Sequence, residues 1–188
     1  MNTCSDLVFK HHLQTLRRDA QQNSRMVWLN IELLDLKKPH PLLANVHCPR
    51  EVQKLKIQLK VLCGDFYSKS VIGLRNNTST ACLLCDADYE DDLHVFGPTG
   101  CPALYDPQDS ILPQIKEAAL SCDPVVDISD DPKIFVQVAC DPASPSLSHN
   151  NRVNLNNPNE CEKIFRLTRQ YIFCLHSLRA RKIKQLED

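Results

Sequence analysis

Three cysteines and one histidine near the middle of the sequence have the types and the spacing of metal ligands. Cys82 and Cys85 are separated by two residues, and His94 and Cys101 follow them. Two cysteines at this spacing can contact one ion when the chain between them turns tightly, and thiolate with imidazole is a donor set that tetrahedral zinc uses. The pattern predicts one Zn²⁺. All four positions would be filled by protein, so the zinc would be structural and not catalytic.

Two other interpretations of these cysteines stay open. They could be unrelated free thiols, or Cys82 and Cys85 could form a redox pair. A thioredoxin-like pair lies at the end of a strand that leads into a helix, and the residues around Cys82 show no such pattern. Cys101-Pro102 is typical of a helix start, where the helix dipole favours a thiolate that can bind metal.

Tyr89-Glu90-Asp91-Asp92 lies between the second cysteine and the histidine and matches the Y-x-D-D motif of reverse transcriptases. In that motif adjacent carboxylates hold catalytic Mg²⁺, and apolar strands must aim them. The flanking residues here are polar and acidic, and no second region supplies the remaining carboxylates in an apolar strand setting. We therefore expect no polymerase activity, and no other enzymatic activity, from this chain.

Charge is distributed unevenly along the 188 residues, although the net charge is only −1. The segment 82–131 contains twelve acidic residues and one basic residue, whereas the rest of the chain carries a net charge of +10. Basic flanks around an acidic middle favour an anionic partner, although a solvated helix surface would show the same composition. The sequence contains no apolar run long enough to predict a membrane-spanning helix. Ten cysteines without a leader-like N-terminal segment indicate a reducing compartment, the nucleus or the cytoplasm.

Helical periodicity dominates the sequence, and we predict a mainly α fold. It would be a helical domain with a central zinc-stapled loop and a long C-terminal helix. Early helices are expected at about 5–21 and 25–36, followed by one that begins at Pro49 and another that begins after Asp131. We divide the chain into an N-terminal helical region (1–81), a Cys3His knuckle (82–104), an acidic helical region (105–141), a flexible linker rich in Pro, Ser and Asn (142–158) and a basic C-terminal helix (159–188).

Two helices carry the basic residues that would contact phosphate. In the helix after Pro49, an apolar stripe contains Val52, Leu55, Leu59 and Leu62, and the basic side chains should face away from it. The end of the C-terminal helix is basic on all sides and should leave the body of the domain. The predicted nucleic-acid contacts are Arg50, Lys54, Lys56, Lys60, Arg179, Arg181, Lys182 and Lys184.

Several short strings together suggest a family. Leu62-Cys63-Gly64-Asp65-Phe66-Tyr67 precedes the Cys82–Cys85 pair, and Glu90-Asp91-Asp92-Leu93-His94 and Cys101-Pro102-Ala103-Leu104 follow it. Leu167-Thr168-Arg169 and Leu175-His176-Ser177-Leu178-Arg179 come later. In this order the strings resemble the C-terminal, zinc-knuckle region of non-LTR (LINE-type) retrotransposon reverse transcriptases. Gly97-Pro98-Thr99-Gly100 departs from the short apolar run that the family usually has before its last cysteine.

The resemblance implies a specific role. Such a region is the tail of a polyprotein that also holds an endonuclease and a polymerase, and it is thought to help engage template RNA or target DNA. It would bind zinc through Cys82, Cys85, His94 and Cys101. The chain would then be a nucleic-acid-binding module, or a truncated copy of one, with the polymerase portion of the polyprotein as a further partner. The alternative is a zinc-stabilised protein-interaction domain that binds no nucleic acid.

Overall fold

The computed structural model describes residues 11, 14–15, 18, 48–62, 66, 68–122, 125–128, 131–143, 147–153 and 158–187. Within these residues the secondary structure is helical and contains no strand, which confirms the mainly α prediction. Of the helix predicted at 5–21, residues 11, 14, 15 and 18 are helical, and the helix predicted at 25–36 lies outside the described residues.

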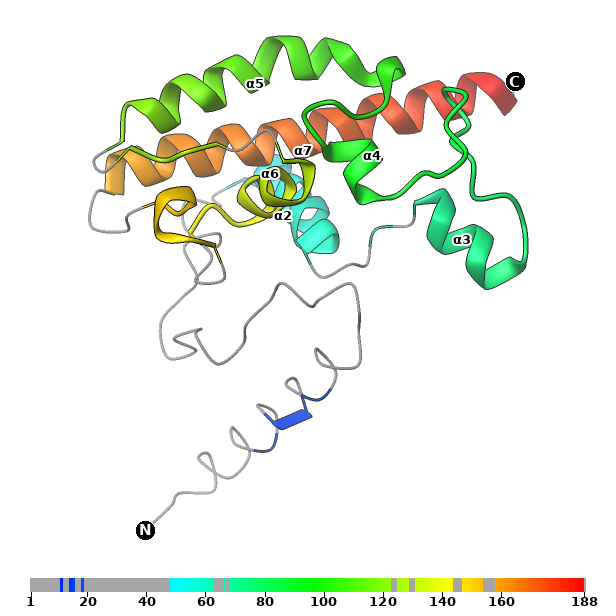
Figure 1. Cartoon of the computed structure of the whole chain (residues 1–188), viewed down its shortest axis with the longest axis horizontal. Helices are drawn as coiled ribbons and strands as arrows, with labels where there is room; N and C mark the ends of the chain where they lie inside the picture. The colour runs from blue at the N-terminus through cyan, green and yellow to red at the C-terminus, as the bar shows by residue number, and fades with distance from the viewer. Residues whose placement is uncertain are drawn as a thin grey trace.

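The long helix α7, Pro158–Glu187, is the central element of the fold (Figure 1). Its apolar side chains recur at helical spacing, so they lie along one side of the helix. Ile164, Tyr171, Ile172 and Leu175 are completely buried on that side. The helices α2 (Pro49–Leu62), α5 (Tyr105–Leu120) and α6 (Pro132–Cys140) all pack against α7, and α5 runs along much of its length (Figure 1).

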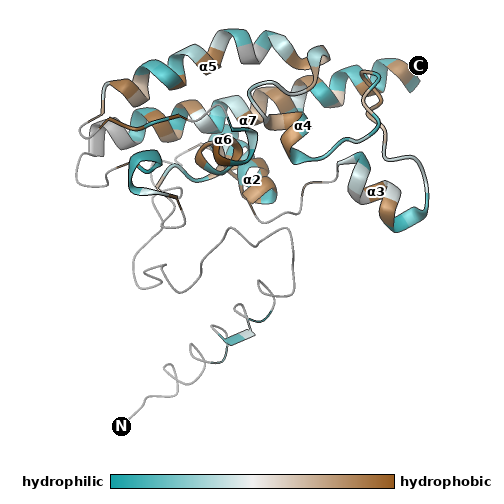
Figure 2. Ribbon diagram, in the orientation of Figure 1, coloured by the Kyte–Doolittle hydropathy of each residue, from teal (hydrophilic) through white to brown (hydrophobic). Residues whose placement is uncertain are grey.

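Proline residues mark the starts of two of the helices that pack against α7. The helix α2, Pro49–Leu62, begins at a proline, as does α6, Pro132–Cys140. Proline fits the first helical turn because its missing N–H would have no partner there. Asp131 caps α6 by accepting hydrogen bonds from the N–H groups of Lys133 and Ile134. Figure 2 shows the strongly hydrophobic α6 among the other helices.

The segment that contains the predicted ligands connects a short helix to α5. The helix α3, Lys69–Asn76, precedes it, and α4, Asp92–Phe96, lies within it. A 3-10 turn, η4, Pro102–Leu104, leads into α5, Tyr105–Leu120. Val95 and Phe96 are completely buried, so α4 is part of the hydrophobic core and contacts both α6 and α7.

The stretch 142–158 differs from the flexible linker that its composition predicts. Ala143, Leu147 and Val153 are buried, and the Val153 N–H donates a 2.8 Å hydrogen bond to the carbonyl of Pro142. A 3-10 turn, η5, His149–Asn151, follows Leu147, and the N–H of Asp127 donates to the carbonyl of Asn150. The described part of this stretch is therefore packed against the domain because its few apolar side chains enter the core.

Candidate metal centre

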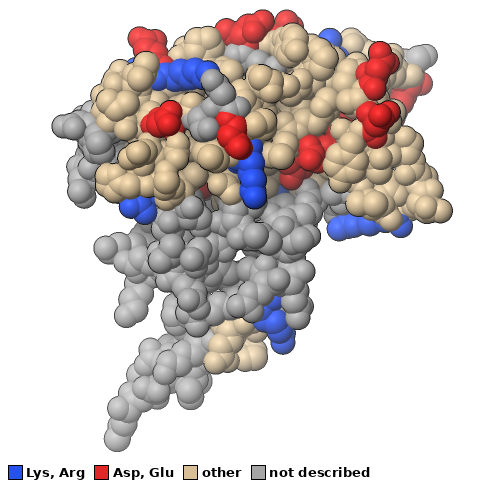
Figure 3. All heavy atoms as spheres, in the orientation of Figure 1, with Lys and Arg blue, Asp and Glu red and all other residues tan. Residues whose placement is uncertain are grey.

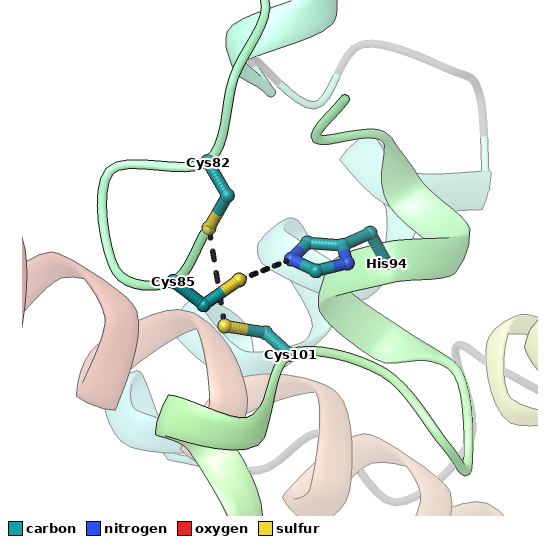
Figure 4. A group of neighbouring side chains, drawn as sticks. All are labelled: Cys82, Cys85, His94 and Cys101. Carbon is teal, nitrogen blue, oxygen red and sulfur yellow. Dashed lines mark hydrogen bonds between the residues drawn. The ribbon is translucent and has the colours of Figure 1, made fainter. Parts of the chain in front are cut away.

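The two cysteines of the pair lie in a tight turn held by backbone hydrogen bonds. The Cys82 N–H donates to the carbonyl of Ala87 at 2.9 Å, and the Glu90 N–H donates to the carbonyl of Thr80 at 2.9 Å. The chain thus folds back on itself across the turn. Such a fold-back can direct the side chains of Cys82 and Cys85 to the same side, as the spacing predicts (Figure 4).

His94 and Cys101 are brought to this turn by α4 and the loop that follows it. Asp91 caps α4 by accepting a 2.8 Å hydrogen bond from the backbone N–H of His94. The chain then returns sharply, and the Cys101 N–H donates to the carbonyl of His94 at 2.7 Å. A Cβ atom on Gly97 or Gly100 would lie 2.4 Å from a carbonyl oxygen of α4. Glycine at these two positions therefore permits the close return that positions Cys101.

The four side chains converge on one point (Figure 4). The Sγ atoms of Cys82 and Cys101 are 3.9 Å apart, and Cys85 Sγ lies 3.4 Å from His94 Nε2. All four ligand atoms lie within 4.8 Å of one another, so together they could bind one metal ion. These cysteines are free thiols, because a disulfide would bring two sulfurs to about 2.05 Å.

The protein environment changes the pKa values of the two buried thiols, Cys82 and Cys101. Burial raises the pKa of Cys82 and raises the pKa of Cys101 to about 12. The backbone N–H of Leu84 opposes this effect at Cys82 by donating to its sulfur at 3.4 Å. Metal binding here must therefore release protons, so it should weaken as the pH falls.

Behind the four ligands lies a buried carboxylate that sequence reasoning did not assign to the site. Glu90 is completely buried, and its Oε2 accepts a 3.4 Å hydrogen bond from the Cys82 thiol. Its Oε1 accepts a hydrogen bond from the backbone N–H of Lys69 at 2.8 Å. Burial would raise the pKa of Glu90, but its hydrogen bonds with Arg179 and the Lys69 N–H outweigh burial and hold that pKa below its usual value. The only local feature that could have associated Glu90 with the site is its position one residue before Asp91, the cap of α4.

Arg179 lies inside the structure, whereas the sequence predicts that it belongs to a helix end that leaves the body of the domain. Its Nη2 is 2.5 Å from Glu90 Oε1, and its Nε donates to Glu90 Oε2 at 3.2 Å. Its guanidinium also lies over the ring of Phe66, 5.5 Å from the centroid. The expectation that the basic end of α7 leaves the body at this residue is therefore wrong, because a buried acid from a distant segment holds the arginine.

Lys54 is the second predicted phosphate contact that faces inward. Only 8% of Lys54 is exposed, and its Nζ lies 2.7 Å from Glu51 Oε1, whereas Val52 of the predicted apolar stripe is 51% exposed. The buried face of α2 is thus rotated from the predicted stripe and includes Gln58. Arg169 of α7 also contacts Glu51, at 3.2 Å. Lys54 is therefore part of an ion-pair network that joins α2 to α7.

The other predicted phosphate contacts lie at the surface. Arg50, Lys56 and Lys60 are exposed on α2, Arg181 and Lys184 are exposed on α7, and Lys182 is half-buried. The charge of Lys60 contributes, after burial and Arg179, to a lowered pKa of His176 on α7, so the end of α2 lies near α7. Acidic and basic side chains are mixed over the face in Figure 3, so the described residues form no continuous basic patch there.

Comparisons with known proteins give no match to a family model, to a curated protein or to a solved structure. Among the described residues, no helix has the length and apolar character needed to cross a membrane. The geometry therefore defines a Cys3His cluster in a helical domain, and function has to be argued from this site and its surroundings.

Proposed function

We propose that this chain is a helical binding module stabilised by one structural zinc ion, and that its outer basic residues contact the phosphate backbone of RNA or DNA. The observation that carries the proposal is the convergence of Cys82, Cys85, His94 and Cys101 on one point. The likeness of the sequence to the tail of retrotransposon reverse transcriptases supports the nucleic-acid part. Under this proposal the chain is a module, or truncated copy, from such an element.

The separations between donor atoms support zinc as the ion. Zinc–sulfur bonds of about 2.3 Å and zinc–nitrogen bonds of about 2.0 Å in a tetrahedron place two sulfurs about 3.8 Å apart and a sulfur and a nitrogen about 3.5 Å apart. The observed 3.9 Å and 3.4 Å agree with these values. Four protein donors fill a tetrahedral shell and leave no position for substrate, which favours a structural role.

Measuring the metal content of full-length reduced protein tests the zinc site. About one zinc per chain is expected, since one four-donor cluster holds one ion. Cys82→Ser and Cys85→Ser should each remove it, whereas the matched controls Cys48→Ser and Cys122→Ser should retain it, because neither control residue belongs to the cluster. The absence of zinc from freshly prepared wild-type protein would refute the site.

Nucleic-acid binding would depend on the basic residues that remain at the surface. Contacts to phosphate release counterions, so the logarithm of affinity falls linearly with the logarithm of salt concentration, by about 0.9 per contact on duplex DNA. Replacing Arg181, Lys182 and Lys184 together with Gln should lower this slope by roughly 2 to 3. The triple variant of Lys133, Lys163 and Arg166 is a matched control, because it removes the same charge from exposed positions elsewhere.

Two observations favour the second candidate, a protein-interaction domain. Arg179 and Lys54 are engaged inside the fold, and the large apolar side chains of Leu74 and Leu120 are highly exposed. An equal salt slope for wild type and the Arg181, Lys182 and Lys184 variant, with weak binding at physiological salt, would decide for this second function. Zinc would then stabilise the fold without any role for nucleic acid.

A further inference from the structure

One oxygen of Glu90 connects the candidate metal centre to α7. Glu90 Oε2 accepts hydrogen bonds from the Cys82 thiol at 3.4 Å and from the Nε of Arg179 at 3.2 Å. The other oxygen, Oε1, accepts from the Lys69 backbone and lies 2.5 Å from Arg179 Nη2. The thiol, the backbone N–H and the guanidinium that contact this carboxylate are all hydrogen-bond donors, and the guanidinium carries a full positive charge.

This arrangement has a consequence for metal binding. A metal ligand is a thiolate, so Cys82 can no longer donate a hydrogen to the carboxylate when it binds an ion. Three thiolates and a neutral imidazole around Zn²⁺ would leave the centre with a net charge of −1, so its sulfur and Glu90 Oε2 would repel each other at a buried position. Such a pair costs free energy unless a cation compensates it. Arg179 is placed to do so, because its guanidinium binds both oxygens of the carboxylate.

Arg179 is itself held in place by aromatic residues of the knuckle side of the domain. Its guanidinium lies over Phe66, whose ring meets that of Phe96 edge-to-face with centroids 4.9 Å apart. Phe96 is the last residue of α4, the helix that carries His94. The arginine is therefore connected through Phe66 to the helix that positions one of the ligands, and its side chain is only 13% exposed.

We infer that Arg179 is a positioning residue of the metal centre, which neutralises Glu90 so that this carboxylate can lie against the metal-bound sulfur of Cys82. The inference rests on the proposed zinc site. It removes Arg179 from the nucleic-acid interface and gives it an electrostatic role at the metal. Partners outside the ligand shell typically change metal affinity by roughly 10- to 100-fold, and an effect of this size is expected here.

The experiment is a Co²⁺ titration of the full chain, followed by the sulfur-to-cobalt charge-transfer absorption, with Zn²⁺ competition to give affinities. Arg179→Gln should weaken binding by roughly 10- to 100-fold, because it leaves a carboxylate uncompensated beside the thiolate. Glu90→Gln should bind at least as tightly as wild type, because it removes the negative charge beside the thiolate while its amide oxygen can still accept from Arg179 or Lys69. Arg181→Gln is the matched control on the same helix, since Arg181 is exposed.

The double variant Glu90→Gln/Arg179→Gln separates this electrostatic role from a purely structural one. If Arg179 compensates Glu90, the double variant should recover most of the affinity that Arg179→Gln loses. If the pair only holds the fold together, the double variant should bind as weakly as Arg179→Gln or more weakly, and this result would overturn the inference. Equal affinities of Arg179→Gln and wild type would also overturn it.

Helical content is a further readout. Circular dichroism checks the helical content of each variant. If Arg179→Gln has lost its helices, Glu90→Gln decides: affinity equal to or above wild type supports the inference, and weaker binding counts against it. Wild-type protein that binds neither Co²⁺ nor Zn²⁺ would refute the proposed zinc site, and the inference with it, whereas normal wild-type binding with unaltered variants refutes the inference alone.

Discussion

Replacing Tyr171 with Phe tests how α7 is joined to the segment that holds the metal ligands. Tyr171 is 0% exposed, and its hydroxyl donates to the carbonyl of Phe96 at 3.2 Å and lies 3.4 Å from the carbonyl of Gly97. These carbonyls end α4, just before the return that positions Cys101. The substitution deletes one oxygen atom, and the edge-to-face contact between this ring and Phe135, with centroids 5.5 Å apart, is retained.

The magnitude follows from burial. A hydrogen bond contributes about 1 kcal/mol net, and removing a donor from a buried acceptor costs about 1 to 3 kcal/mol. We therefore expect Tyr171→Phe to lower the free energy of unfolding by about 1 to 2 kcal/mol. With a urea m-value of about 2 kcal/mol/M, the unfolding midpoint should fall by roughly 0.5 to 1 M.

Equilibrium urea unfolding, followed by circular dichroism, measures this shift. Tyr105→Phe is the matched control because Tyr105 is 47% exposed, and its change should stay within about 0.5 kcal/mol. Equal midpoints for the two variants would refute the reasoning, since the buried hydroxyl would then contribute no more than an exposed one. A changed m-value would instead indicate that the substitution altered the compactness of the folded or unfolded state.

Two further predictions concern the metal and the pH. Removal of the metal by a chelator should raise the rate of amide hydrogen exchange across 80–91. The helix α4 should keep its protection from exchange, because Val95 and Phe96 are anchored in the core. An equal loss of protection over all helices would contradict this prediction. Burial, together with the charges of Arg179 and Lys60, lowers the pKa of His176. The unfolded chain therefore binds the proton more readily, and chelated protein should lose stability as the pH falls below about 6.5. Urea unfolding at two pH values should show a smaller loss for His176→Gln than for the exposed control His149→Gln, and equal losses would refute the assignment.

The convergence of the four candidate ligands could be predicted from the sequence because the ligands lie close together along the chain and local turns position them. Cys82 and Cys85 need only one turn, and His94 follows a capping residue, Asp91, that starts its helix. The starts of α2 and α6 could be predicted for the same reason, since proline and aspartate act on the adjacent backbone. None of these features requires knowledge of which distant segments meet.

The roles of individual charged residues could not be predicted because they depend on tertiary packing. Arg179 and Glu90 are 89 positions apart, and no local pattern joins them. Lys54 pairs with the nearby Glu51, but its burial depends on how α2 is rotated against α7. The packing of Leu147 and Val153 was missed similarly, because a composition rich in Pro, Ser and Asn identifies turns without showing whether they lie on a core.

The end of α7 shows why the two proposed roles of its basic residues can be separated experimentally. Successive residues of an α-helix are rotated by about 100°, so Arg179 and Arg181 project about 200° apart. The first is directed to Glu90 and the metal centre, and the second is exposed. Neutralising Arg179 should therefore change metal affinity and leave the salt dependence of nucleic-acid binding unaltered. Neutralising Arg181 with Lys182 and Lys184 should do the reverse, because charge held in a buried pair cannot also release counterions from phosphate.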